Sequence, residues 1–283
     1  MIKLLKSVVK RNSILAKVSR SVIDSQFKWQ TPMKTGHGFL MVGNRNMMEG
    51  KFEIEETQLV QKLLDRSEVF INIGANIGYY CLMALNKGKH TVAVEPMPRN
   101  VECLIRNVTL NGWQNDIELL PMALGESCGL IKIYGGGTVA SLVKGWSDTP
   151  DKYFHWTPLS TVDKLFGSRF ATEKCLVLVD VEGAELHLLR GALQFMAKAI
   201  KPIWMVEICI DEHLPDGLAI NPNLLETFDL FWNSGYKSFI ADHLLNAVRR
   251  EDILSIIKNN KNTLNNHNFI FCDEQAAKGL ANM

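Results

Sequence analysis

The fold is decided by residues 69–96, which read VFINIGANIGYYCLMALNKGKHTVAVEP. An apolar, β-branched run opens this stretch, and a second such run closes it at Glu95. A glycine-containing loop and a segment long enough for a short helix lie between the two runs. Short apolar strands joined through helices are typical of parallel sheets that are covered on both faces. The stretch therefore predicts a strand, a loop, a helix and a second, parallel strand.

The loop discriminates between classes of bound cofactor. A dinucleotide-binding loop needs glycine at the first, third and sixth positions of G-x-G-x-x-G, because a pyrophosphate must approach bare backbone. Those positions are held here by Gly74, Asn76 and Tyr79, and Gly78 comes one place early. A nicotinamide or flavin cofactor is therefore disfavoured. The residues instead predict a tight turn at Gly74, a left-handed conformation at Asn76 and a close helix start at Gly78.

Glu95 ends the second predicted strand, directly after this loop. In nucleoside-binding α/β folds an acid at this place accepts hydrogen bonds from the ribose hydroxyls. The alternative for Glu95 is a surface charge at a strand end or an acid at a helix N-terminus. Ala123, after the third apolar run, is small enough for a flat adenine to lie against the backbone. The loop and the acid together favour a nucleoside cofactor without a pyrophosphate.

Outside this stretch, short apolar runs alternate with segments of helical periodicity. These runs are EVFINI (68–73), HTVAVE (90–95), IELLPMAL (117–124), CLVLVDV (175–181) and IWMVEICI (203–210). The alternation predicts a parallel sheet with helices on both faces. Two later runs, YKSFIA (236–241) and NHNFIFCD (266–273), are separated by a polar insert and fit an antiparallel pair.

The region from Gly125 to Thr172 is the longest piece expected to be irregular. Long loops at the carboxyl ends of parallel strands usually form the substrate wall of a site. The region includes a group of aromatic residues, Trp146, Tyr153, Phe154, His155 and Trp156. Two roles remain open for them, namely anchoring the loop on the core and providing a platform for the substrate.

Composition bounds the possible functions. The 283 residues contain 31 Lys and Arg against 30 Asp and Glu, so no overall charge favours binding to nucleic acid. The six cysteines are scattered, which fits reduced thiols in a cytoplasmic protein without a secretory leader. Residues 1–22 are basic and amphipathic. This segment is either a solvated or core-docking helix or a peripheral contact with an anionic membrane surface.

Several motifs resemble those of the FkbM family of S-adenosylmethionine-dependent methyltransferases, in the same order and at similar spacing. They are FINIGANIGYY, VEP, MALGE, STVDKL, VDVEGAELHLLRGA and VEI, and the resemblance as a whole runs from about residue 52 to residue 272. The resemblance implies a class I methyltransferase fold, an α/β Rossmann-like architecture whose seven-stranded, mostly parallel sheet carries helices on both faces and an antiparallel C-terminal strand. It also implies transfer of a methyl group to a hydroxyl oxygen, often on a sugar, a glycolipid or a polyketide.

The division of the chain follows from these patterns. We expect a basic N-terminal helix over residues 1–25, a connecting segment over 26–51, a methyltransferase domain over 52–274 and a C-terminal tail over 275–283. The expected partner is a small-molecule or glycan acceptor. The sequence does not indicate an oligomeric state.

The candidate site residues lie in the loop and at the ends of the predicted strands. For binding S-adenosyl-L-methionine they are Asn72, Gly74, Asn76, Gly78, Tyr79, Glu95, Pro96, Ala123 and Asp180. For catalysis they are Asp180, Glu182, Glu207 and His213, because an acceptor hydroxyl must lose its proton to a carboxylate or an imidazole near the methyl group. Glu185 is interpreted as an acid that supports a helix start. The strand-end carboxylates are also hard oxygen ligands of the kind Mg²⁺ prefers, but no metal site is predicted.

Two positions depart from the family pattern. Asn72 stands where the family usually has Asp, and Leu178 stands where it often has Lys. These departures support an alternative, a non-catalytic protein that keeps the cofactor fold. A Rossmann oxidoreductase is the weaker alternative, because the glycines that a dinucleotide requires are missing.

Overall fold

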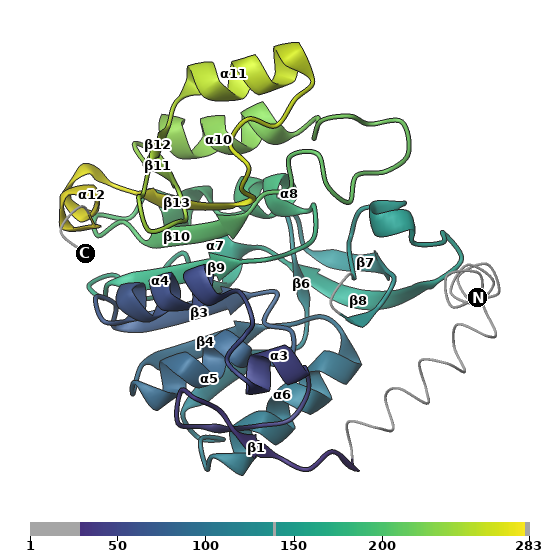
Figure 1. The fold of residues 1–283 in the computed structure, drawn as a ribbon, viewed down its shortest axis with the longest axis vertical. Helices are drawn as coiled ribbons and strands as arrows, with labels where there is room; N and C mark the ends of the chain where they lie inside the picture. Colours follow the sequence, from purple (N-terminus) through teal and green to yellow (C-terminus); the bar gives the residue numbers. More distant parts are fainter. Residues whose placement is uncertain (1–28, 138–139, 281–283) are drawn as a thin grey trace.

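The computed structural model describes residues 29–137 and 140–280. Its main sheet has eight strands in the order β12-β11-β13-β10-β9-β3-β4-β5. In Figure 1 this order runs from the top of the molecule downward, with β3 and β4 in the lower half. The strands are β3 (Val69–Ile73), β4 (His90–Val94), β5 (Ile117–Leu120), β9 (Cys175–Val179), β10 (Ile203–Glu207), β11 (Lys237–Ile240), β12 (Ala247–Val248) and β13 (Asn268–Cys272).

The sheet is mostly parallel, as the sequence predicts. Strands β5, β4, β3, β9 and β10 are parallel neighbours. Strand β13 runs antiparallel to both β10 and β11, which confirms the expected antiparallel C-terminal strand. The sheet has one strand more than expected, because the two-residue β12 pairs with β11 at its edge.

Helices cover both faces of the sheet, and each face has its own core. Along β3, Val69, Ile71 and Ile73 pack into one core, whereas Phe70 packs into the other. This alternation follows from the two-residue period of a strand. The first core is covered by α7 (Val162–Phe166), α8 (Glu185–Arg190), α9 (Leu193–Met196), α10 (Leu224–Asn233) and α11 (Arg250–Asn259). The second is covered by α4 (Ile54–Leu64), α5 (Tyr79–Asn86), α6 (Pro98–Leu110) and α12 (Glu274–Leu280).

The third apolar run divides between two sheets, which the sequence reading did not anticipate. Pro121, which has no backbone N–H to donate, separates β5 from β6 (Ala123–Leu124). Strand β6 joins a separate sheet of order β6-β8-β7. Its other strands, β7 (Gly129–Tyr134) and β8 (Phe154–Ser160), pair antiparallel. The region from Gly125 to Thr172 is therefore not irregular throughout, and the expectation of one long loop was wrong.

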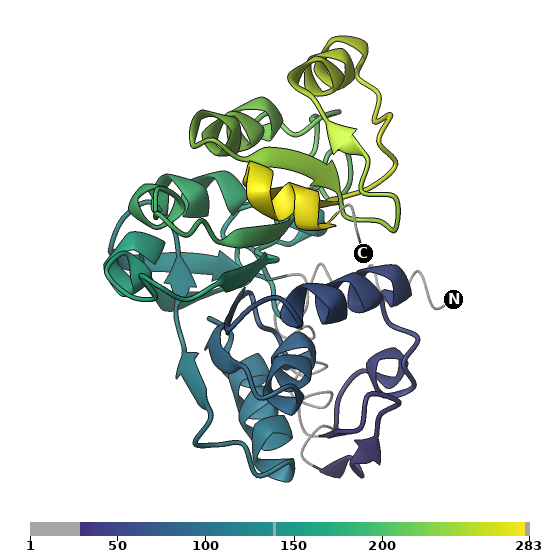
Figure 2. The same ribbon diagram turned by 90° about the vertical axis from the view of Figure 1, so that its left-hand side faces the viewer.

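The segment before α4 packs against the domain. It contains β1 (Met33–Lys34), β2 (Leu40–Met41) and α3 (Arg45–Met48). Asn107 of α6 and Asn111, which follows its last residue, accept hydrogen bonds from the backbone N–H groups of Val42 and Leu40, both at 2.8 Å. The segment, coloured purple, lies in the lower half of the molecule beside the blue helices (Figure 2). Residues 29–51 therefore belong to the folded body rather than serving only as a connection.

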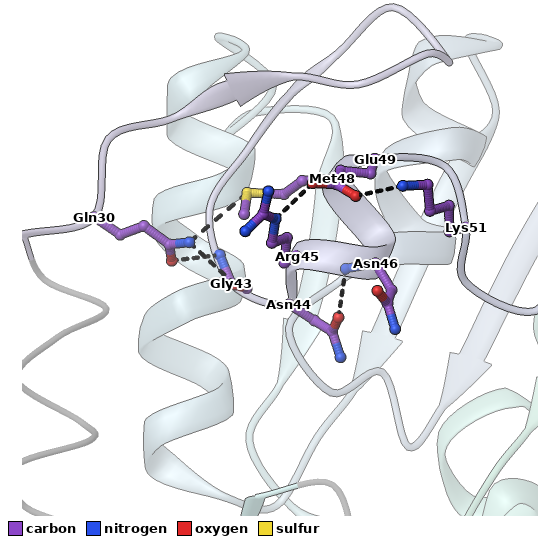
Figure 3. Close-up of polar contacts among 8 residues, drawn as sticks. All are labelled: Gln30, Gly43, Asn44, Arg45, Asn46, Met48, Glu49 and Lys51. Atoms are coloured by element: carbon purple, nitrogen blue, oxygen red, sulfur yellow. Dashed lines mark hydrogen bonds and ion pairs between the residues drawn. The ribbon is translucent and has the colours of Figure 1, made fainter.

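Local polar contacts hold this segment in shape (Figure 3). Gln30 bridges to Gly43, accepting from its N–H at 2.8 Å and donating to its carbonyl at 3.1 Å. Asn44 caps α3 by accepting from the N–H of Asn46 at 2.8 Å. Glu49 pairs with Arg45 and with Lys51.

The structure describes only one of the two ends of the chain. The expected basic helix over residues 1–25 lies outside the described residues. Residues 274–280, expected mainly as a tail, form α12, and its Leu280 is buried against the second core.

Candidate functional site

The site is built on a row of residues at the carboxyl edge of the sheet. The last paired residues of four neighbouring parallel strands are Val94, Ile73, Val179 and Val206, and they stand side by side in register. The residues that follow them are Glu95, Gly74, Asp180 and Glu207. Ligands in open α/β folds bind outside this edge, at the carboxyl ends of the strands. Strand register thus brings three carboxylates and the glycine loop to one rim.

The loop after β3 has the conformation that the sequence predicts. Gly74, Asn76 and Gly78 all have positive φ, at 86°, 50° and 90°. A Cβ on Gly74 would lie 1.8 Å from the carbonyl oxygen of Asp180, and one on Gly78 would lie 2.9 Å from Leu104. Glycine is therefore required at both places by contact as well as by conformation. Gly78 is the N-cap residue of α5, as expected.

Glu95 is buried and held by three N–H donors. Its carboxylate accepts hydrogen bonds from the backbone of Asn76 at 2.7 Å, from the backbone of Met97 at 2.9 Å and from the Asn100 side chain at 3.1 Å. Burial raises the pKa of Glu95, and the three donors oppose that rise. A carboxylate offers about four lone-pair positions, so capacity remains for a further donor from the adjacent cleft. Asn100 was missed by sequence reasoning, although its position in the first turn of α6 after an acid is a usable signal.

A narrow cleft opens between these elements. Seven of the predicted site residues line it, namely Gly74, Asn76, Glu95, Pro96, Ala123, Asp180 and Glu182. The second sheet contributes Leu124 of β6 and Ile133 of β7 to its wall, together with Gly137, Ala140 and Leu142 from the connection between β7 and β8. The sequence predicted that the region after Gly125 forms a wall of the site, but it did not predict that β7 and β8 pair there.

Asn72 lies under the glycine loop and outside the cleft lining. Its side chain is buried, and Nδ2 contacts the Cys81 sulfur at 3.6 Å. Within the described part of the chain, Oδ1 of Asn72 has no hydrogen-bond partner. Leu178 stands directly opposite Asn72 in the β3–β9 ladder and is also buried. The two departures from the family pattern are therefore cross-strand neighbours on one face of the sheet.

Tyr79 also points away from the cleft. Its hydroxyl lies 3.2 Å from Nε2 of His37, and its ring packs edge-on against Phe39, Phe52 and Tyr80. The ring is buried in the second core. The structure thus places Tyr79 in the packing of α5 against the segment before α4, not at the ligand-facing surface.

Asp180 and Glu207 form an unneutralised pair. Asp180 accepts no hydrogen bond from any described residue, and Glu207 receives only a weak contact from the Cys209 sulfur at 3.8 Å. Burial raises the pKa of Asp180 well above its usual range, and the charge of Glu207 raises it further. Burial also raises the pKa of Glu207, followed by the charges of Glu182 and Glu53. Both side chains therefore favour the protonated form more than an isolated carboxylate does.

Glu182 is held in a strained turn by Trp146. Glu182 has a φ of 53°, and its carboxylate accepts from the Trp146 indole N–H at 2.7 Å. A Cβ on the next residue, Gly183, would lie 2.3 Å from the Trp146 ring. Burial raises the pKa of Glu182, and the Trp146 hydrogen bond opposes the rise. Backbone strain of this kind persists only where the surroundings enforce it, and it gathers at functional sites.

His213 stands at the rim, on an exposed loop. It has a φ of 60°, and its Nδ1 lies 3.3 Å from the Ser147 hydroxyl. The Ser147 N–H donates to the His213 carbonyl at 2.9 Å. These contacts tie the loop after β10 to the connection between β7 and β8. Glu185 is buried and accepts from the N–H of Gly183 at 2.8 Å, which fits its interpretation as helix support.

The aromatic residues of the β7–β8 region have different roles. Trp146 is 2% exposed and anchors its loop on the Glu182 turn. Trp156 is 62% exposed on β8, where it packs edge-on against Phe154 and beneath the ammonium group of Lys132. The anchoring role therefore holds for Trp146, and Trp156 stays available to solvent.

A family model identifies the family of this chain. The model of the methyltransferase FkbM domain matches residues 72–237, which is more than half of the chain. The chain belongs to the FkbM methyltransferase family. S-adenosylmethionine is the cofactor of this family, and a nicotinamide cofactor is thereby set aside.

Solved structures that resemble this FkbM-family chain are also methyltransferases. An FkbM methyltransferase from Methylobacillus flagellatus is 21% identical over 50% of this chain and 32% of that one, with a TM-score of 0.36. A precorrin-6y C5,15-methyltransferase from Geobacter metallireducens is 10% identical over 70% and 78%, with a TM-score of 0.39. A putative O-methyltransferase from Klebsiella pneumoniae is 11% identical over 76% and 77%, with a TM-score of 0.39. The matched part spans about a third of the first of these chains.

No curated protein matches this chain closely enough to be compared with it. The assignment therefore depends on the match over residues 72–237. Within the described ranges, no helix is long and apolar enough to cross a membrane. In the same ranges, no three His, Cys, Asp or Glu side chains are grouped so that they hold a metal ion.

Proposed function

We propose that this FkbM-family protein transfers the methyl group of S-adenosylmethionine to a hydroxyl oxygen of a glycan, a glycolipid or a secondary metabolite. The observation that carries the proposal is the row of Glu95, Gly74, Asp180 and Glu207 at the carboxyl edge. The end at Glu95 and Gly74 suits a nucleoside. At the other end, Asp180 and Glu207 have no neutralising partner among the described residues. A methyl acceptor that must lose a proton requires a carboxylate or an imidazole at that second end.

The residues at the first end fit an adenosyl cofactor. Glu95 is fixed by its three donors and keeps capacity to accept from ribose hydroxyls. Gly74 and Asn76 of the loop line the cleft, and Pro96 and Ala123, which also line it, would contact the adenine. Asp180 has no neutralising partner among the described residues, which suits the positively charged end of the cofactor. Asn72 and Tyr79 lie outside the cleft, and we assign them the role of supporting the glycine loop.

The second end fits deprotonation of the acceptor. When bound, the cofactor supplies a methyl group already activated by a positive sulfur. The chain then has to align the acceptor oxygen and take its proton, and alignment alone contributes up to about 7–11 kcal/mol in favourable cases. We assign proton acceptance to Glu207 or Asp180, with Glu182 and His213 shaping the rim. As the oxygen–carbon bond forms and the carbon–sulfur bond breaks, the hydroxyl proton moves to the carboxylate.

A labelled-methyl experiment tests the reaction. The protein is incubated with S-adenosylmethionine carrying a deuterated methyl group and with extracts of cell-envelope glycans, and the products are examined by mass spectrometry. We expect one labelled product class, and Glu207→Gln should lower its rate by about 10²- to 10⁴-fold. Tight binding of S-adenosylhomocysteine without turnover of any acceptor would instead favour a non-catalytic binding protein.

Calorimetry tests the cofactor end separately. Glu95→Ala should weaken S-adenosylhomocysteine binding by about 10- to 100-fold, because hydrogen bonds to a charged acceptor are lost. Glu95→Gln guards against a folding defect, since it keeps the size of the side chain. Glu102→Ala, an exposed acid on α6, is the control and should leave affinity unchanged. Equal affinity in all four proteins contradicts the role of Glu95.

A further inference from the structure

A second cavity adjoins the site, next to an asparagine-rich loop. The loop covers residues 260–267, NKNTLNNH, and joins α11 to β13. Because β13 runs antiparallel to β10, its first residue, Asn268, pairs with Glu207, the last residue of β10. The loop before β13 therefore stands at the carboxyl edge of the sheet, beside the loop after β10 (Figure 1). The polar insert noticed in the sequence is thus brought to the functional edge by one reversed strand.

The cavity has a volume of about 420 Å³. Its walls are the first turn of α4, the loop after β10 and the asparagine-rich loop. The polar side chains among its lining residues are Glu56, Asp211, Glu212, Asn262, Asn265, Asn266 and His267. The volume is within the range of about 300–1,000 Å³ that small-molecule sites occupy.

Several polar groups of the cavity are unused within the described structure. Asn262 is committed, because it donates to Asp211 at 3.2 Å and caps its own turn. Asn266 uses only Oδ1, which accepts from the N–H of Asn268 at 2.7 Å, so Nδ2 remains for a ligand. The side chains of Asn265 and Glu56 make no hydrogen bond to any described residue. Donors and acceptors are thus both available on facing walls.

The cavity is connected to the proposed acceptor end by short backbone and charge contacts. The Ile208 N–H donates to the His267 carbonyl at 2.6 Å, directly after Glu207. Burial raises the pKa of Glu53. The hydrogen bond from Tyr80 and, to a smaller extent, the charge of His267 lower it. Glu53 in turn contributes to raising the pKa of Asp180. The loop after β10 also carries His213, which contacts Ser147 in the connection between β7 and β8.

The chemistry of the lining selects a class of ligand. No Lys or Arg lines the cavity, and three carboxylates do, so a phosphate or another anion is disfavoured. The His, Asp and Glu side chains do not group closely enough to hold a metal ion, within the residues that the structure describes. Planar amides and carboxylates offer paired donors and acceptors, which match neighbouring hydroxyls.

We propose that this cavity binds an uncharged sugar residue of the methyl acceptor, next to the hydroxyl that is methylated. The proposal depends on the proposed transfer to a glycan hydroxyl and names the part of the chain that recognises the glycan. It also assigns a role to the asparagine-rich loop, which the cofactor site does not use.

Ligand-observed NMR with defined glycosides tests the proposal on the full chain. The probes are methyl β-D-glucopyranoside, methyl β-cellobioside and, as the anionic counterpart, methyl β-D-glucuronide. We expect saturation transfer from the protein to the two neutral glycosides and not to the glucuronide. The double variant Asn265→Gly/Glu56→Ala should weaken neutral glycoside binding by about tenfold, since each lost hydrogen bond accounts for a factor of a few.

A matched variant controls for effects on the loop backbone. Asn260 and Asn265 both have left-handed conformations, with φ of 47° and 49°, and only Asn265 lines the cavity. Glycine retains this conformation at both positions. Asn260→Gly should therefore bind the neutral glycosides as the unmodified protein does. Equal weakening by Asn260→Gly, unchanged binding in the double variant, binding of the glucuronide as strong as that of the neutral probes, or no glycoside binding at all would overturn the proposal.

S-adenosylhomocysteine calorimetry on the same proteins separates the two proposals. Affinity for S-adenosylhomocysteine should differ by less than about twofold among the cavity variants, because they lie outside the cofactor cleft. If the unmodified protein failed to bind S-adenosylhomocysteine but bound the neutral glycosides through Asn265, the cavity would stand and the methyl-transfer proposal would fail. If the unmodified protein bound S-adenosylhomocysteine but no glycoside, the methyl-transfer proposal would stand and the cavity proposal would fail.

Discussion

At the scale of single residues, the most informative position is Asn72. It is buried, its Oδ1 has no partner among the described residues, and Leu178 faces it across the ladder. A buried polar atom without a partner costs about 1–3 kcal/mol, and an unpaired buried charge costs more. The neutral amide is thus the better match to an apolar neighbour, and the two departures from the family pattern are consistent with each other.

Substitution at this pair tests the interpretation. Asn72→Asp should lower the free energy of unfolding at neutral pH by about 2–4 kcal/mol, because it places a carboxylate beside Leu178 with no cation. The loss should shrink as the pH falls, since protonation removes the charge. Adding Leu178→Lys should recover part of the loss, and Leu178→Lys alone should also destabilise. Urea unfolding of the four proteins at two pH values measures this, and additive effects in the double variant would contradict the pairing.

Glu185 provides a pH-dependent contribution to stability. Burial raises the pKa of Glu185 to about 7. Because the folded pKa lies above the unfolded one, the stabilisation is present at low pH and is lost as the pH rises toward about 7. The loss amounts to no more than about 3 kcal/mol at 1.36 kcal/mol for each pKa unit.

The comparison with Glu185→Gln isolates this contribution. Asp180 and Glu207 titrate in the same direction, so the unmodified protein alone does not report on Glu185. The variant should lose stability less steeply than the unmodified protein between about pH 4.5 and pH 7.5. Urea unfolding across this range checks the difference, and parallel curves would show that Glu185 does not titrate in it.

At the scale of elements, the turn at Glu182 and Gly183 is one place where the second sheet is attached to the main one. Trp146, in the connection between β7 and β8, packs on Gly183 and donates to Glu182. Ser141 donates to the Glu182 carbonyl from the same connection. This attachment sets the position of the wall that faces the glycine loop, so the shape of the cleft depends on contacts far apart in the sequence.

Gly183→Ala should disrupt this attachment. The new Cβ would meet the Trp146 ring, and the alanine would have to keep a φ of +89°. We therefore expect a loss of about 2–4 kcal/mol in stability and weaker S-adenosylhomocysteine binding. Gly217→Ala is the matched control, because Gly217 has a φ of +88° with nothing within 4 Å. It should lose only the conformational part, about 1–2 kcal/mol, and keep cofactor affinity. Thermal unfolding and calorimetry compare the two variants, and equal losses would remove the role of Trp146.

At the scale of the whole molecule, the sheet divides two apolar cores and places Glu95, Asp180 and Glu207 at one edge. The balance of 31 basic and 30 acidic residues leaves no overall field to attract an anionic polymer. The acidic rim of Asp180, Glu182 and Glu207 likewise favours neutral or cationic ligands over anions. The basic residues 1–22 stand apart from this balance in the sequence, and they lie outside the described residues.

The membrane alternative for residues 1–22 predicts reversible binding to anionic surfaces, which a sedimentation experiment distinguishes from an accessory helix. The full chain should sediment with vesicles that contain phosphatidylserine, and the charge reversal Lys3→Glu/Lys6→Glu/Lys10→Glu should abolish this, at about 1 kcal/mol for each basic residue. Vesicles of phosphatidylcholine alone are the control. Binding that persists at high salt or in the charge-reversed chain would contradict an electrostatic contact.

The sequence by itself determined the local parts of this protein. The period of the apolar runs indicated the parallel strands, and the residues at 74, 76 and 78 indicated the turn, because a positive φ and a close approach exclude most side chains. Glu95 could be proposed because it follows directly on that turn. The motifs then placed the chain in its family, and the family implied the cofactor.

Only the tertiary structure decided which distant residues share the edge. Strand register places Glu207 beside Asp180 and sets Leu178 against Asn72, and the packing of α5 turns Tyr79 into the core. The split at Pro121, the β7–β8 sheet and the position of the asparagine-rich loop also follow from pairing between distant segments. Hydrogen bonds between strands depend on partners far away in the chain, and the periodicity of one segment carries no record of which partner it takes.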